Sequence, residues 1–341
     1  LGDVYKRQVL QNRSFVHGSG NLIKTESENG KNMEKKKIII DTDIGDDIDD
    51  AYALSYLIKE RATELLGVTT VYRNSLQRAK IVSALLHTLN ETHVKVYAGN
   101  DYPYKSSFTV EKFEKVLPDG RPVIPHYDDT LASFPVEEKG AAEFIAETAE
   151  RYPGEVTLLA IGPLTNLADV ARKYPSSYKK LKGVVCMGGC FAAKKAEWNI
   201  RCDPEGAAIA TAGGVPFRYI GVDITIRTAL GKAETERLMQ IRSPETPLLK
   251  KMLQKWIDTH PGRKPTMHDV LAAAELLAET GTTLIGYTIN GIEAGITGYG
   301  YGYGYGYYGR YGYGRKYGYG YGYGYGYGYG EKQEKHSSKN G

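Results

Sequence analysis

Cysteines, long apolar runs and a strong excess of one charge are scarce or missing in this sequence of 341 residues. The three cysteines, Cys186, Cys190 and Cys202, are an odd number without paired spacing, so we expect no disulfide framework and a reducing compartment. No apolar run approaches the length that spans a bilayer, so we expect no membrane segment. The formal net charge is only +4, much of it from the polar ends, and it indicates no nucleic-acid partner.

Both ends of the chain differ from its middle. Residues 1–32 are polar and lack the apolar centre of a signal peptide, and the first methionine is Met33. We expect translation to begin at Met33 and residues 1–32 to be a disordered or non-native leader. From Gly298 the sequence is almost pure Gly-Tyr alternation, and we expect residues 298–341 to be a disordered low-complexity tail. Aromatic self-association and stacking on nucleic acid are the alternative uses of such a tail.

Residues 38–54, IIIDTDIGDDIDDAYAL, begin with three isoleucines and then carry a dense group of aspartates. The isoleucines predict a strand buried on both faces, and the segment from Asp49 to Arg61 predicts a helix whose acidic start suits the helix dipole. The carboxylates therefore lie in the turn at the carboxyl edge of a parallel sheet, where open α/β folds bind ligands. They repel one another unless a cation lies among them, and oxygen ligands indicate Ca²⁺ or Mg²⁺. A solvated acidic loop is the alternative, but it does not explain the buried strand.

Strands and helices alternate along the rest of the chain. Strands are expected at 65–71, 94–98, 156–161, 183–187 and 217–224. Helices are expected at 76–89, 141–152, from the turn at 162–166 to 173, at 204–212, 234–241 and 247–258, and from 268. This alternation predicts an α/β fold, a doubly wound and mostly parallel open sheet with helices on both faces, in one domain over residues 33–297. Residues 99–138 lack clear periodicity and are expected to form a lid or rim.

Polar residues follow several of these predicted strands or begin the predicted helices. Asn74 follows the second strand, Glu197 and Asn199 lie in an expected loop, and His268-Asp269 begins the last helix. A doubly wound fold can bring these residues to the edge where the aspartate cluster lies. Each of these residues alone is weak evidence for a functional site, because polar residues are also common at helix starts and in loops. Together they indicate a metal-held polar substrate and a water to be activated.

Five motifs occur in an order that resembles the inosine-uridine preferring nucleoside hydrolases. They are DTDIGDDIDDA, VTTVYRN, LLAIGPLTNLA, VVCMGGC followed by AEWNIRCDPEGA, and TMHDVLAAA, and they extend over residues 36–298. The resemblance implies hydrolysis of ribonucleosides to ribose and free base. It also implies a bound Ca²⁺, held by the side chains of Asp41, Asp50 and Asp269 and by the carbonyl group of Ile161. The ribose 2′ and 3′ hydroxyls and a nucleophilic water complete the shell in that family.

The resemblance also implies roles for residues around the metal. Asp43 matches the carboxylate that takes the proton of the water, and His268 matches a residue that faces the departing base. The matched residues that bind the ribose are Asp49 and Asn74, with Met187, Glu197 and Asn199 around its 5′ side. Members of the family are commonly dimers or tetramers, so we expect a homo-oligomer that acts on a small ribonucleoside. Because the sequence shows no signal peptide, we expect it in the cytoplasm.

Three features depart from the family pattern. GDDIDDA is two residues longer than the common form, so alignment on Asp46-Asp47 is an alternative to alignment on Asp49-Asp50. Residues 99–138 lack the histidine-rich loop of several members, which leaves His126 as a weak candidate for base recognition and the base preference open. The Gly-Tyr run replaces the strand and helix with which members normally continue, so the domain is expected to be truncated.

Two other interpretations remain from the sequence. A haloacid-dehalogenase-type phosphotransferase also carries DxD after its first strand, and Asp41 would then be a covalent nucleophile that works with Mg²⁺. A nucleoside hydrolase-like domain that only binds ribosyl ligands, or that has lost activity, is the second interpretation.

Overall fold

The computed structural model describes residues 35–104, 116–193 and 196–278. The chain divides into two units, Leu1–Glu293 and Ala294–Gly341, and every described residue belongs to the first. The leader expected at 1–32 and the tail expected at 298–341 lie outside the described residues.

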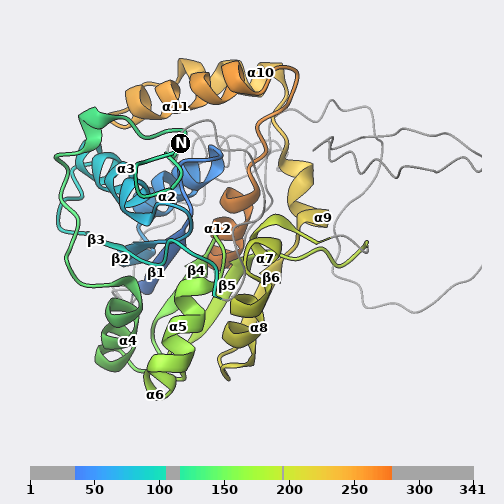
Figure 1. Ribbon diagram of the computed structural model, residues 1–341. Helices are drawn as coiled ribbons and strands as arrows, with labels where there is room; N and C mark the ends of the chain where they lie inside the picture. Colours follow the sequence, from blue (N-terminus) through green and yellow to red (C-terminus); the bar gives the residue numbers. More distant parts are fainter. Residues whose placement is uncertain (1–34, 105–115, 194–195, 279–341) are drawn as a thin grey trace, which may run out of the picture. The chain divides into compact units, whose positions relative to one another are not determined.

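Six strands form one sheet in the order β3-β2-β1-β4-β5-β6, and each neighbouring pair is parallel (Figure 1). The strands are β1 (Lys36–Thr42), β2 (Thr63–Thr70), β3 (Lys95–Ala98), β4 (Thr157–Ala160), β5 (Gly183–Met187) and β6 (Phe217–Ile220). The predicted doubly wound α/β fold is confirmed. The strand predicted at 217–224 is wrong beyond Ile220, because the chain turns at Gly221 into the short helix α9 (Val222–Thr225).

The longer predicted helices are confirmed to within about two residues at each end. They are α2 (Asp49–Lys59), α3 (Ser75–Thr88), α4 (Ala141–Arg151), α5 (Thr165–Lys173), α8 (Pro204–Ala212), α10 (Lys232–Gln240), α11 (Thr246–Thr259) and α12 (His268–Ala278). Short helices add α6 (Pro175–Tyr178), α7 (Trp198–Cys202) and α9 (Val222–Thr225), and two 3₁₀ turns lie at η1 (Asp129–Leu131) and η2 (Ile226–Thr228). The loop predicted at Glu197–Asn199 is therefore wrong: Glu197 caps α7, whose first turn includes Asn199.

The alternation of side chains along β1 explains the two helical layers. Ile38 and Ile40 pack in one buried cluster with residues of α2, α3, α11 and α12, whereas Ile39 packs in another with residues of α4, α5, α6 and α8. Figure 1 shows the second group of helices below the sheet. Successive side chains of a strand point to opposite faces, so a run of three isoleucines is what a central strand covered on both faces requires.

The segment between β3 and α4 covers part of α3. The backbone N–H of Ile124 donates to Gln77 Oε1 at 2.8 Å, and Lys80 donates to the carbonyl of Phe134. Ile124 is buried and reaches the turn after β1, where a Cβ added to Gly45 would come within 2.4 Å of its Cγ2. The described part of the expected lid or rim thus packs against the aspartate-rich turn.

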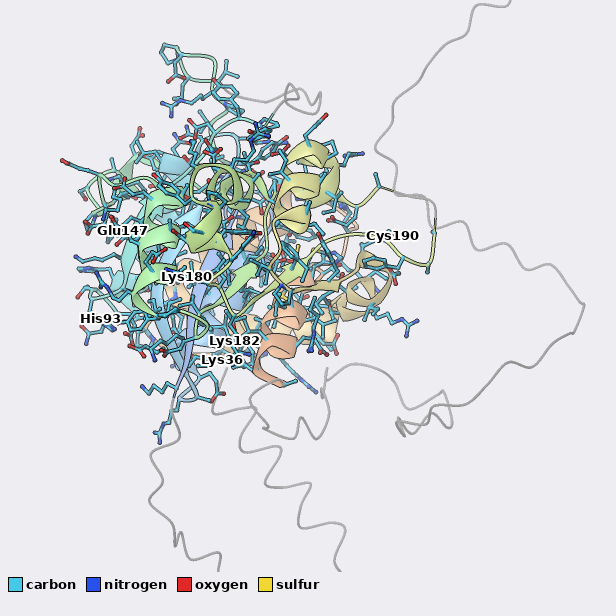
Figure 2. All side chains as sticks on the ribbon, turned by 90° about the horizontal axis from the view of Figure 1, so that it is seen from below. Lys36, His93, Glu147, Lys180, Lys182 and Cys190 are labelled. Carbon is cyan, nitrogen blue, oxygen red and sulfur yellow. The ribbon has the colours of Figure 1, made fainter. Side chains whose placement is uncertain are left out.

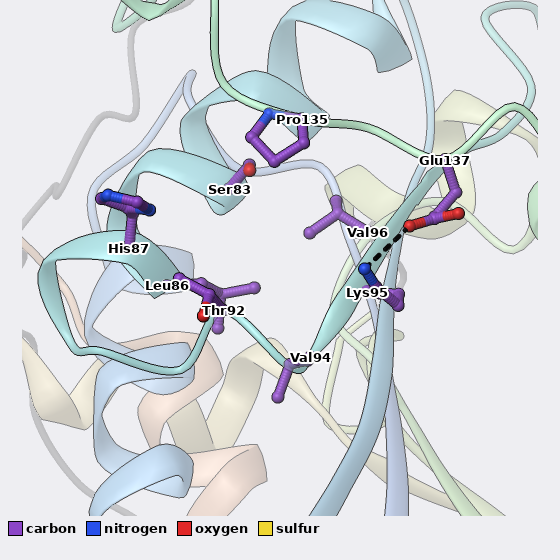
Figure 3. A pocket seen from close by; sticks show the side chains of 9 residues that line it. All are labelled: Ser83, Leu86, His87, Thr92, Val94, Lys95, Val96, Pro135 and Glu137. Atoms are coloured by element: carbon purple, nitrogen blue, oxygen red, sulfur yellow. Dashed lines mark ion pairs between the residues drawn. The ribbon is translucent and has the colours of Figure 1, made fainter.

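Two surface features lie away from that turn. A hollow of about 40 Å³ lies at the amino end of β3, between α3 and the segment at Pro135, with Lys95 and Glu137 paired at 3.3 Å on its rim (Figure 3). Because ligands bind at the carboxyl edge of a parallel sheet, this hollow is not placed for the chemistry predicted above.

Cys190 lies on the loop after β5, on the other side of the domain from His93 (Figure 2). All three cysteines have free thiols.

Candidate active site

The carboxyl ends of β1, β2, β4 and β5 lie along one edge of the sheet because all of these strands are parallel. The segments that follow them carry most of the residues predicted for the site. The hydrogen bonds between neighbouring strands continue past the strand ends. The N–H of Ile161 donates to the carbonyl of Asp41 at 2.8 Å, and the N–H of Val71 donates to the carbonyl of Thr42 at 3.1 Å. The backbone alone therefore brings the predicted residues to one place.

Three buried carboxylates, those of Asp49, Asp50 and Asp269, meet at this edge. Each offers an oxygen, and these oxygens lie within 4.8 Å of one another. Asp49 and Asp50 occupy the first turn of α2 and Asp269 the first turn of α12, where helix dipoles favour negative charge. The N–H of Asp269 donates to Asp49 Oδ2 at 3.1 Å, and the Thr42 hydroxyl donates to Asp50. We refer to these three residues as the acidic trio.

The acidic trio fits a hard cation. Burial, followed by the charges of neighbouring aspartates, raises the pKa of all three carboxyls well above their usual range. Like charges this close in a buried place oppose ionisation unless a positive charge lies between them. An oxygen-only donor set is the one that Ca²⁺ and Mg²⁺ prefer.

Asp43 lies close enough to the acidic trio to act on it electrostatically. Its charge contributes to the raised pKa of Asp49, Asp50 and Asp269. Burial raises the pKa of Asp43 itself to about 7, against the opposing effect of the Arg78 guanidinium. A carboxylate with this pKa is suited to accept a proton near neutral pH.

Asp41 lies outside the acidic trio. Its Oδ1 accepts from the Thr69 hydroxyl at 2.5 Å and from Asn166 Nδ2 at 2.8 Å, while Oδ2 is buried and has no hydrogen-bond partner among the described residues. Burial raises the pKa of Asp41 to about 7. The haloacid-dehalogenase interpretation required Asp41 as an attacking nucleophile, and a fully buried carboxylate held by two side chains is not placed for attack.

Asn199 links two strand ends. Its Nδ2 donates to the carbonyl of Ile161 at 3.2 Å and to that of Met187 at 3.0 Å. Glu197 accepts three backbone N–H groups, from Gly189, Asn199 and Ile200, at 2.9–3.1 Å. The carbonyl of Ile161 and the polar group of Asn199 are therefore fixed beside the edge at which the acidic trio lies.

His268 and Asn74 lie at two helix starts. Nδ1 of His268 lies 2.6 Å from the hydroxyl oxygen of Thr225, and burial lowers its pKa to about 4, so the ring is neutral at pH 7. Asn74 caps α3 by accepting from the N–H of Gln77 at 3.2 Å, and its amide donates to the carbonyl of Pro122 at 3.4 Å.

The structure brings Asp49 and Asp50, rather than Asp46 and Asp47, to Asp269. Asp46 instead pairs with Arg73 and Arg78 at 2.9 Å each. Burial alone would raise the pKa of Asp46, but the two guanidinium groups outweigh it and hold this pKa below its usual range. The longer turn therefore carries a structural ion pair in addition to the acidic residues of the site.

Sequence reasoning missed Arg78, Asn166 and Thr225. Arg78 was detectable, because it is a lone charge among the apolar residues on the inner face of α3, next to Ala79 and in line with Ile81 and Val82. Asn166 and Thr225 carry no such signal, since amides and hydroxyls are common at helix starts and in turns.

This fold and site define an α/β enzyme whose oxygen-only centre lies at the carboxyl edge of a parallel sheet. Residues 38–302 match the family described as inosine-uridine preferring nucleoside hydrolase, and the chain belongs to this family. The predicted resemblance is confirmed, as is the prediction of an enzyme that hydrolyses the N-glycosidic bond of ribonucleosides. The haloacid-dehalogenase interpretation is wrong.

Named relatives agree with the family assignment. Uridine nucleosidase 1 of Arabidopsis thaliana is 34% identical over 233 residues, which cover 66% of this chain and 68% of that protein. Pyrimidine-specific ribonucleoside hydrolase RihB of Escherichia coli O157:H7 is 32% identical over 209 residues, 58% of this chain and 62% of that protein.

Solved structures show the same fold. A plant nucleoside hydrolase, PpNRh1, has a TM-score of 0.61 at 24% identity and covers 74% of this chain and 81% of its own. A purine-preferring ribonucleoside hydrolase from Gardnerella vaginalis has a TM-score of 0.57 at 27% identity, with 72% and 81% covered. In the part of the chain that the structure describes, no helix is long and apolar enough to cross a membrane.

Proposed function

We propose that this enzyme hydrolyses ribonucleosides to ribose and free base with a Ca²⁺ ion at the acidic trio and Asp43 as the general base. The observation that carries the proposal is the meeting of Asp49, Asp50 and Asp269, from opposite ends of the chain, beside Asp43. When bound, Ca²⁺ would lower the pKa of a water and orient the 2′ and 3′ hydroxyls of ribose.

Asp50 and Asp269 are the carboxylates proposed to hold the ion, together with the carbonyl oxygen of Ile161. That carbonyl is already oriented by Asn199, which supports the assignment. Asp41 is kept in the proposed metal shell through its unpartnered Oδ2, since Oδ1 is occupied by Thr69 and Asn166. Ca²⁺ accepts six to eight oxygen ligands, so ribose hydroxyls and water complete the shell.

Asp43 accepts the proton of the attacking water. Its burial and its place beside the acidic trio support this role. The ribose becomes positively charged as the C1′–N bond breaks, and buried carboxylates beside it stabilise that charge.

His268 assists the departing base. A neutral imidazole has one N–H, and we propose the tautomer in which the Thr225 hydroxyl donates to Nδ1 and the ring proton lies on Nε2. From Nε2 the ring can donate to the base as negative charge develops on it. The residues proposed to bind the ribose are Asp49, Asn74, Met187, Glu197 and Asn199.

Membership of the family supports a ribonucleoside as the substrate. The preference for a purine or a pyrimidine base is a separate question. The two named sequence relatives are called uridine and pyrimidine-specific hydrolases, whereas the Gardnerella protein is called purine-preferring. We propose a pyrimidine ribonucleoside as the preferred substrate, on the higher identity of the former. We also propose a homo-oligomer that acts in the cytoplasm, for which three free thiols are suitable.

The test is release of free base and reducing sugar from uridine, cytidine, inosine, adenosine and 2′-deoxyuridine. The full chain is assayed with Ca²⁺ and again after exhaustive chelation. Metal-dependent cleavage of the ribosides but not the deoxyriboside supports the proposal. A cooperatively folded sample that binds Ca²⁺ and uridine but cleaves none of the five favours the alternative, a domain that only binds ribosyl ligands.

A further inference from the structure

The turn between β1 and α2 is held from outside at three successive carbonyl oxygens. Arg78 Nη1 donates to the carbonyls of Asp43 and, at 2.9 Å, of Ile44, and the N–H of His126 donates to that of Gly45 at 3.0 Å. Buried carbonyl groups outside regular structure need such donors. The turn therefore depends on groups from α3 and from the covering segment.

Arg78 is the centre of this arrangement. It is fully buried on α3, and its guanidinium also donates from Nε to the carbonyl of Tyr72 at 2.8 Å and from Nη2 to Asp46 at 2.9 Å. One side chain thus joins the turn after β1 to the turn after β2. A buried guanidinium is costly unless it is paired, and Asp46 supplies the paired charge.

Asp46 also joins these two turns, because its carboxylate bonds to arginines on the turn after β2 and on α3. Its Oδ2 accepts from Arg78 and also from Arg73 Nη1, at 2.9 Å in each case. Arg73 and Tyr72 both have left-handed backbone conformations, with φ of 65° and 75°, which are uncommon in residues other than glycine. Strained conformations of this kind persist where surrounding contacts fix them, and the two residues lead directly into Asn74.

We propose that Asp46, Arg73 and Arg78 form a positioning unit that fixes the Asp43 carboxylate toward the acidic trio and aligns the Asn74 turn beside it. The unit acts through the backbone of the turn, at the carbonyls of Asp43 and Ile44, so its members are positioning residues and not catalytic ones. The inference rests on the proposed function and explains why the longer turn carries an additional acid.

The test compares Asp46→Ala, Asp46→Glu and Glu245→Ala in the full chain with Ca²⁺. Glu245 is a suitable control because it is a buried carboxylate paired with Lys59, outside both turns. For each variant, kcat and KM for uridine, Ca²⁺ affinity by calorimetry and Tm are measured.

Loss of the unit is expected to lower kcat about 30-fold, since a displacement of about 1 Å at the reacting groups has effects of this size. Asp46→Glu should recover most of kcat, because it restores the charge that pairs with both arginines. Ca²⁺ affinity should change by less than about threefold, since the proposed ligand oxygens lie on other residues.

Three results would overturn the inference. The first is a kcat of Asp46→Ala within about twofold of the wild type. The second is an equal loss in Glu245→Ala, which would reduce the effect to general stability. The third is a loss that Asp46→Glu does not recover at all. A wild-type protein that binds Ca²⁺ but cleaves no nucleoside is a different result, which overturns the proposed function together with this inference.

Discussion

Asp49 Oδ2 accepts a hydrogen bond from the backbone N–H of Asp269 at 3.1 Å, across 220 residues of sequence. The bond joins the first turn of α2 to the first turn of α12, where one oxygen from each member of the acidic trio lies within 4.8 Å of the others. The start of the chain's first buried helix and the start of its last described helix thus form one site.

Asp43→Asn should lower kcat for uridine by about 10³-fold, within the range that general acid–base groups contribute. Asparagine has nearly the same shape but cannot take a proton, so binding of Ca²⁺ and ribose should be partly retained. Steady-state kinetics with calorimetry of Ca²⁺ and of ribose measure both quantities. Near-normal turnover in Asp43→Asn would show that another group takes the proton.

Ca²⁺ should stabilise the folded protein, because it removes the repulsion within the acidic trio. A ligand present at 100 times its dissociation constant stabilises by about 2.7 kcal/mol. We expect Tm to rise with Ca²⁺ and to fall after chelation, as measured by scanning calorimetry. In Asp269→Asn, which removes one of the three charges, the chelated form should melt higher than the chelated wild type and the Ca²⁺-dependent rise should be smaller. An equal rise in both proteins would place the ion elsewhere.

His126 should make the protein sensitive to acid between pH 6.5 and pH 4. Burial lowers the pKa of His126 from 6.5 to about 4, although the charge of Asp46 opposes the shift. A lowered pKa in the folded state means that the unfolded chain binds the proton first, so this contribution to stability is present above pH 6.5 and is lost as pH falls. The loss reaches about 2 kcal/mol at pH 5.

Urea unfolding of the wild type and of His126→Gln at pH 7 and pH 5 measures this effect. The difference in unfolding free energy between the two pH values should be about 2 kcal/mol smaller in His126→Gln. His93→Gln is the matched control, because the His93 side chain is 75% exposed and its removal should leave the difference unchanged. Equal pH dependence in all three proteins would contradict the prediction.

Gly45→Ala should destabilise the fold by about 2–4 kcal/mol, through strain at φ +115° and a contact at 2.4 Å with Ile124. Gly154→Ala separates the two causes, since Gly154 also has a positive φ, +77°, but has open space around it. We expect Gly154→Ala to cost only about 1 kcal/mol. Chemical denaturation of both variants measures the costs, and equal values would show that Ile124 moves aside.

Much of the fold was predictable because local pattern and tertiary packing agree. Ile38 to Ile40 are apolar in sequence and buried on both faces in the sheet, and the helix expected at 204–212 is α8 (Pro204–Ala212). The pattern of apolar residues did not predict where β6 ends. The strand predicted to continue past Ile220 ends there, and the apolar residues Val222 and Ile224 lie in the short helix α9 instead.

The candidate site was only partly predictable. Asp49, Asp50 and Asp269 follow recognisable motifs, and they meet as a family resemblance implies. The contacts of Asp41 with Thr69 and Asn166 join residues 28 and 125 positions away, and only the assembled sheet shows them. A carboxylate in a motif can be identified from sequence, but the partners that occupy its oxygens cannot.

The origin of the acidic trio has a consequence for synthesis of the protein. Asp49 and Asp50 leave the ribosome more than two hundred residues before Asp269, and a nascent chain without α12 lacks the third carboxylate. The six strands of the sheet can pair during that interval, because every one of them precedes Thr225. If the acidic trio holds Ca²⁺ as proposed, binding of the ion would require that the last described helix has docked, and the order of translation would delay activity until the domain is assembled.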